Sequence, residues 1–111
     1  MSDSETGVVL LIARTPERAE AERIGEALVE KRLAACGSVL PNVHSFFRWE
    51  GRLQREHEAL LLIKTSAERS AAAQAELRSL HSLDNPEILE VQVTGGSADY
   101  LSWVLSEVRS S

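Results

Sequence analysis

The sequence predicts an α+β domain of the ferredoxin-like type, with the order β-α-β-β-α-β and an extra C-terminal helix. The apolar run 8–13 and the segment 58–64, whose centre is continuously apolar, are typical of strands that are buried on both faces. A stretch with apolar residues at helical spacing follows each run. A length of 111 residues suits a single domain. This pattern places both long helices on one face of a four-stranded antiparallel sheet.

The first half of the chain reads as strand, helix and a long strand. After the strand at 8–13, Thr15 is a good N-cap and Pro16 a good first residue for a helix that runs to about residue 32. Residues 34–49 favour extended structure, and the missing backbone donor of Pro41 predicts a bulge or kink beside Asn42. Residues 49–52 then supply a turn.

The second half repeats the scheme and adds the terminal helix. A strand at 58–64 leads into Thr65 to Glu68, which matches a capping box that opens a helix ending near Leu80. Residues 86–93 predict the fourth strand, Gly95 and Gly96 end it, and 97–108 predict a short helix. The expected domain spans residues 8–108, and residues 1–7 are expected to form a flexible N-terminal tail.

Composition and charge narrow the classes of partner. The chain has 17 acidic and 12 basic residues, a net charge of −5, and no stripe of Lys or Arg, so nucleic acid is not an expected partner. No apolar run approaches the roughly 18 residues that a membrane span needs, and the N-terminus is polar and acidic. A single cysteine provides neither a disulfide framework nor a CxxC pair. We therefore expect a cytoplasmic protein that does not enter the membrane.

The strands are apolar on both faces, although the fold covers only one of them. Residues 8–12 and 60–63 are apolar at consecutive positions, and Phe46 and Phe47 must point to opposite faces of their strand. An uncovered second face would exceed the few hundred Å² of apolar patch that soluble monomers usually show. The sequence therefore predicts a homo-oligomer assembled through its sheets.

Four segments carry a resemblance to a known family. "LVEKRLAACGSVLPNVHSFFRWEGRL", "EALLLIKT", "NPEILEV" and "YLSWV" resemble the CutA divalent-cation tolerance proteins, from about Val8 to Val104. The resemblance implies a homotrimer similar in build to signalling proteins of the PII type. It also implies a role in tolerance of copper and other divalent metals, without an established enzymatic activity. The chain departs from the family's His-Pro-Tyr-Glu pattern, because it has Ser82 and Leu83 between His81 and Asp84.

Cys36 and His81 are the candidate metal ligands. A lone cysteine is usually a small buried residue, but its sulfur suits Cu(I), and a threefold axis could bring three copies of Cys36 together. His81 follows a helix, where it either caps and packs the loop or contributes to a ligand cleft. His44 and His57 are expected on the surface of the hairpin arms, where their imidazoles could bind Cu(II) adventitiously. We expect weakly bound copper or another divalent metal and no organic cofactor.

A cleft between subunits is the second candidate site. Apolar walls with a few polar groups are typical of ligand sites, although aromatic residues also pack subunit interfaces. Lys64 ends an apolar strand, so it either extends to solvent or pairs with Glu58 or Glu87. By analogy with PII-type trimers, Lys64 and His81 could bind a small anion, or the cleft could bind a partner protein. The expected lining residues are Trp49, Lys64, Tyr100 and Trp103.

A catalytic role is the least supported interpretation. The same fold hosts acylphosphatases, and Arg14 with Asn42 could in principle bind a phosphate. The glycine-rich phosphate cradle is missing, however, and no catalytic triad or carboxylate pair is evident. We therefore expect a protein that is not an enzyme.

Overall fold

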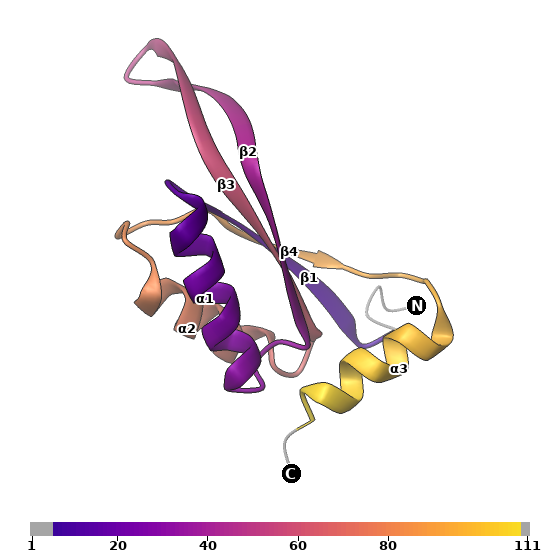
Figure 1. Cartoon of the computed structure of the whole chain (residues 1–111). Coiled ribbons are helices and arrows are strands. Elements are labelled where there is room, and N and C mark those ends of the chain that lie inside the picture. The colour runs from indigo at the N-terminus through magenta and orange to yellow at the C-terminus, as the bar shows by residue number, and fades with distance from the viewer. Residues whose placement is uncertain (1–5, 110–111) are drawn as a thin grey trace.

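The computed structural model describes residues 6–109, and it confirms the predicted α+β architecture (Figure 1). Four antiparallel strands form one sheet in the order β2-β3-β1-β4. Helices α1 and α2 pack on one face, and α3 packs on the other face at one end of the sheet (Figure 1). Within the described range, no helix is both long and apolar enough to span a bilayer. The elements are β1 (Val8–Thr15), α1 (Arg18–Glu30), β2 (Cys36–Trp49), β3 (Arg52–Ser66), α2 (Ser70–Leu80), β4 (Ile88–Gln92) and α3 (Ala98–Glu107).

The main core lies between the sheet and helices α1 and α2. Every second residue of β1 and β3 points to this side, because side chains alternate along a strand. Leu11 and Leu61 are completely buried, and they pack with Ile24 and Leu28 of α1 and Leu77 of α2. The helical spacing that predicted α1 therefore corresponds to its buried face.

Both predicted helix starts are wrong by a few residues. Thr15 does not cap α1, because its hydroxyl donates to the Glu17 carbonyl at 2.7 Å and the helix begins only at Arg18. Thr65 does not open α2, because it is still part of β3 and its buried hydroxyl donates to the Leu33 carbonyl at 2.7 Å. In each case a hydroxyl near the end of a strand satisfies another backbone carbonyl instead of a helix N–H group.

The β2–β3 hairpin is longer than predicted and projects beyond the rest of the sheet (Figure 1). β3 begins at residue 52 rather than 58, so the two strands pair up to Trp49 and Arg52. The predicted bulge is confirmed between Leu40 and Val43. At the tip, Glu50 and Gly51 have φ values of 50° and 78°, which the turn needs and which glycine adopts without strain.

The sheet face opposite α1 and α2, here called the open face, is apolar as predicted. Its centre is half-buried, and its edges carry Leu40, Leu89 and Val91, which are 45%, 53% and 42% exposed. α3 covers only one end of it, where Val104 packs with Val8 in a small second core. The half-buried central residues of the open face are Leu10, Ile12, Leu60 and Leu62.

Substitution of Leu61 by alanine tests the main core. We expect Leu61→Ala to lower the free energy of unfolding by about 2–5 kcal/mol, because it removes a buried side chain and leaves a cavity. Leu83→Ala is the control, since Leu83 is 52% exposed and its loss should change stability by less than about 0.5 kcal/mol. Urea unfolding at equal protein concentration measures both; equal effects would contradict the core described above.

Candidate functional site

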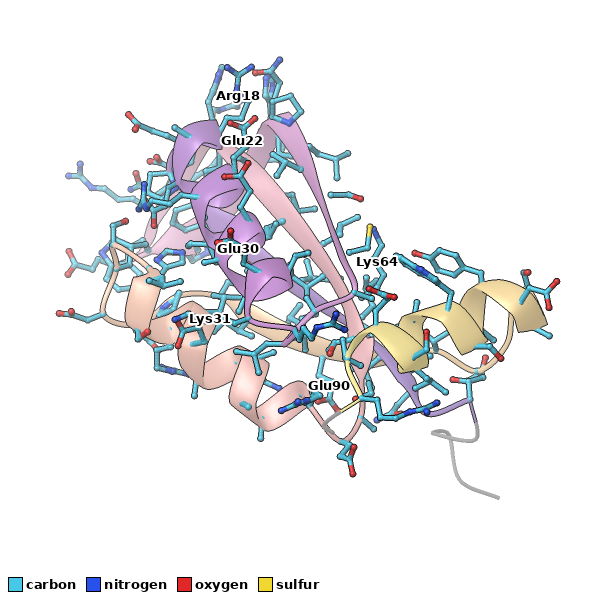
Figure 2. The ribbon with its side chains drawn as sticks, turned by 60° about the horizontal axis from the view of Figure 1, so that its bottom comes forward. Arg18, Glu22, Glu30, Lys31, Lys64 and Glu90 are labelled. Atoms are coloured by element: carbon cyan, nitrogen blue, oxygen red, sulfur yellow. The ribbon has the colours of Figure 1, made fainter. Side chains whose placement is uncertain are left out.

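Polar side chains gather on the open face where β2 and β3 meet α3. Cys36 and Lys64 are cross-strand partners, and both are half-buried. The Lys64 Nζ atom donates to the Ser38 hydroxyl at 2.7 Å and lies 3.8 Å from the Cys36 sulfur. Figure 2 shows Lys64 on the side of the sheet where α3 packs. We call Cys36, Ser38, Lys64 and Tyr100 of α3 the Lys64 cluster.

α3 contributes two aromatic residues at the margin of this cluster. Ser97 caps the helix by accepting the Tyr100 N–H at 3.4 Å. The Tyr100 and Trp103 rings are 5.6 Å apart, and both side chains are more than two-fifths exposed. Partial burial raises the pKa of Tyr100 above its ordinary value, and the nearby Cys36, by its charge and its hydrogen bond, raises it further. Three of the four predicted cleft residues thus belong to one series of neighbours, in which Trp103 lies beside Tyr100, Tyr100 beside Cys36, and Cys36 beside Lys64.

Trp49, the fourth predicted cleft residue, lies at the other end of the molecule. It pairs with Arg52 at the hairpin tip, whereas Lys64 pairs with Cys36 near the base. The stretch of β3 from Arg52 to Lys64 corresponds to about 40 Å of extended strand. Trp49 can therefore line a cleft with Lys64 only if it comes from another subunit, and this part of the cleft stays a prediction.

Arg14, not Lys64, holds the two glutamates that were suggested as partners of the lysine. Its guanidinium lies 2.9 Å from Glu58 and 2.8 Å from Glu87, and 5.8 Å from the centre of the Phe47 ring. With two carboxylates beside one guanidinium, the three side chains together carry a net negative charge. The arrangement is therefore unfavourable for the phosphate-binding role that was considered for Arg14 and Asn42.

His81 is a buried residue with both ring nitrogens engaged. Its Nε2 atom donates to the Arg14 carbonyl at 2.6 Å, and its Nδ1 atom accepts the Leu83 N–H at 3.0 Å. These bonds fit the neutral tautomer and correspond to the loop-packing role that was considered for His81. A metal ion at His81 would have to displace one of them.

The structure does not bring Cys36 and His81 together within one subunit. Cys36 pairs with Lys64, which pairs with Leu10, whereas His81 contacts Arg14 four residues farther along β1. The separation along that strand alone is about 13 Å. Within residues 6–109, no group of three or more His, Cys, Asp and Glu side chains converges to hold a metal ion. The metal roles of Cys36 and His81 stay predictions.

Sequence reasoning missed the partners of these charged groups. Ser38, which accepts from Lys64, and Arg14, which pairs with Glu58, were recognisable only from the register between strands. The same register places His44 opposite His57, with the two rings stacked at 4.2 Å between centroids. The alternation of residues along each strand indicates the face of the sheet on which a side chain lies. It does not indicate which residue of the adjacent strand is its neighbour.

The fold and sequence are similar to those of known proteins. The model of the family "CutA1 divalent ion tolerance protein" matches residues 9–107. The divalent-cation tolerance protein CutA of Pectobacterium atrosepticum is 38% identical, with 91% of this chain and 92% of that protein covered. The Escherichia coli protein of the same name is 34% identical, with 96% and 95% covered.

Solved structures show the same similarity. CutA from Xylella fastidiosa has a TM-score of 0.89 and 40% identity, and the match covers 93% of this chain and 99% of that one. A protein from Archaeoglobus fulgidus, described as a periplasmic divalent cation tolerance protein CutA, has a TM-score of 0.87 and 32% identity, with 92% and 99% covered.

Tyr100 provides a direct probe of the Lys64 cluster, because it is the only tyrosine in the chain. We expect its phenol to titrate above the ordinary value of 10.0, as measured by near-ultraviolet absorbance of the phenolate. Cys36→Ser should lower the midpoint but leave it raised, since burial is the larger cause. A midpoint that does not respond to Cys36→Ser would contradict the contact between the two side chains.

The sign of the linked effect on stability follows from the direction of this shift. Because the pKa of Tyr100 is raised in the folded state, the unfolded chain loses the phenol proton at a lower pH than the folded protein does. The contribution of Tyr100 to the free energy of unfolding is therefore fully present below pH 10.0 and declines as the pH rises further. In Tyr100→Phe, this part of the loss of stability at alkaline pH should be absent.

Proposed function

Because the chain belongs to the CutA1 divalent ion tolerance protein family, we propose that it contributes to tolerance of copper and other divalent cations as a cytoplasmic homotrimer with weak metal binding. The observation that carries this proposal is the family match over residues 9–107. A single cysteine fits a reducing compartment, which supports the cytoplasm as the location.

The apolar open face supports the assembly. Its exposed leucine and valine side chains lie on β2 and β4, the two edge strands of the sheet. Burial of about 800 Å² of such surface by other copies would contribute on the order of 20 kcal/mol before the costs of association. The open face does not determine the number of copies; we take three from the homotrimer that the family resemblance implies.

Cys36 is the proposed metal ligand on this face. Its sulfur suits Cu(I), and three copies around a threefold axis would provide the trigonal set that one subunit lacks. The Lys64 ammonium lies 3.8 Å from that sulfur, so an arriving cation meets a like charge. This repulsion is a physical reason for weak binding. His81, the second proposed ligand, would require the loss of a hydrogen bond to the Arg14 carbonyl or the Leu83 N–H.

Two leucines of equal exposure test the assembly. Leu89 lies on the open face and is 53% exposed, whereas Leu83 lies in the loop after α2 and is 52% exposed. We expect the unmodified protein to sediment at three times the mass of the chain and Leu89→Glu to dissociate, because a carboxylate cannot be buried without a partner. Leu83→Glu should remain assembled. A stable monomer of the unmodified chain at micromolar concentration would refute the trimer.

Removal of the Lys64 charge tests the metal site. We expect Lys64→Leu to strengthen Cu(I) binding by about tenfold, because it removes the like charge beside the sulfur without adding a ligand atom. Lys64→Arg keeps the charge and should bind as weakly as the unmodified protein, and Cys36→Ser should abolish the site. Anaerobic competition with a Cu(I) chelator, repeated with Zn(II), measures each variant. The assignment fails if Cys36→Ser binds Cu(I) as the unmodified protein does, and binding unchanged in His81→Ala would remove His81 from the proposal.

A further inference from the structure

Two histidines stand directly opposite each other on the arms of the hairpin. His44 of β2 pairs with His57 of β3, and both side chains are exposed. The bulge sets this pairing. Without it, the register that places Leu40 opposite Leu60 would continue along the hairpin, and His44 would then lie opposite Glu56 with its side chain on the open face. The extra residue in β2 thus brings two imidazoles to one face, the face on which α1 packs.

The two rings lie close enough to share an ion once their side chains rotate from the stacked arrangement. The imidazole centroids are 4.2 Å apart with 22° between the ring planes. Metal–nitrogen bonds of about 2.0–2.1 Å require two nitrogen ligands about 3 Å apart. Rotation of the side chains on their fixed strands can make up this difference. In the described part of the chain no hydrogen bond or ion pair engages either ring, in contrast to His81 with its two hydrogen bonds.

An open groove beside His57 leaves room for a hydrated ion. It has a volume of about 550 Å³, lies between the hairpin and the start of α1, and is lined by Glu17 and Arg18 as well as His57, whereas the Glu58 carboxylate pairs with Arg14 on the opposite face. The basic groups nearby have other contacts. Arg18, labelled with Glu22 in Figure 2, lies 3.6 Å from that glutamate, and Arg55 lies over the Phe46 ring at 5.5 Å.

We propose that His44 and His57 form a two-imidazole binding site for a divalent first-row transition metal ion, with Cu(II) bound most tightly. Imidazole is a ligand for Cu, Ni and Zn, and affinities in this series peak at Cu(II), whereas Ca²⁺ and Mg²⁺ prefer oxygen ligands. No third protein ligand converges within residues 6–109, so water completes the coordination. Both imidazoles must be neutral to bind, so protons compete with the metal.

This site is separate from the proposed site at Cys36. Seven residues of β3, about 23 Å, separate His57 from Lys64, and the two lie on opposite faces of the sheet. Assembly through the open face does not require the other face of the hairpin to be covered. The histidine pair therefore does not rest on the trimer or on Cys36, and each site can fail without the other.

The unmodified protein provides the first test, because the chain contains only three histidines. Substoichiometric Cu(II) added to untagged protein should broaden the imidazole proton resonances of His44 and His57 together and to the same extent; any broadening at His81 would report on the other proposed site. Broadening of one of the pair without the other would overturn the proposal. This measurement needs no variant, so it stands even if a substituted hairpin does not fold.

Variants in a Cys36→Ser background provide the second test, since loss of the thiol prevents reaction with Cu(II). We expect His44→Gln and His57→Gln each to weaken Cu(II) binding by at least about tenfold, because one chelating ligand is lost. The matched control exchanges neighbours: His44→Ser combined with Ser45→His keeps the composition but moves one imidazole to the opposite face. Calorimetric titration should show the same loss in this variant. Undiminished affinity in the exchanged variant would refute a shared site.

Discussion

The constraint on which the structure depends is a sheet that is apolar on both faces but has helices to cover only one. α1 and α2 bury Leu11 and Leu61 completely, while α3 covers the open face only at one end. Polar groups on that face are consequently paired within the subunit, Lys64 with Ser38 and Arg14 with Glu58. Coverage of this face by another copy would carry a lower desolvation cost at Arg14, which forms an ion pair with Glu58, than at Lys64, whose ammonium has a hydroxyl but no carboxylate as its partner.

The hairpin shows how one extra residue decides which side chains meet. Before the bulge, Cys36 and Ser38 of β2 lie on the open face; after it, odd-numbered residues such as Phe47 do. Phe47 thereby stays beside Arg14, and His44 turns to the other face to meet His57. The bulge at Pro41 therefore determines which side chains of β2 lie on each face of the hairpin.

The order of the elements could be predicted from the sequence because buried strands and helix faces leave periodic patterns. The helix starts could not, since Thr15 and Thr65 are good capping residues that the structure uses at the ends of strands. The length of β3 was underestimated because residues 52–57 are polar apart from Leu53 and carry no apolar run. The site showed the same limit. Lys64 was expected either to extend to solvent or to pair with Glu58 or Glu87, but its ammonium binds the Ser38 hydroxyl, and Arg14 pairs with both glutamates.

The loop after α2 explains how the chain can do without the proline that the family pattern has at position 82. The Ser82 N–H donates to the buried Glu20 carboxylate at 2.8 Å, a bond that proline could not make because it lacks the N–H group. The next N–H, of Leu83, donates to the His81 ring. Two side-chain acceptors thus hold a segment that proline would otherwise stiffen. The His81 ring also binds the Arg14 carbonyl, so it connects this loop to the end of β1. The burial of His81 is therefore explained by contacts within the chain and does not need a bound ligand.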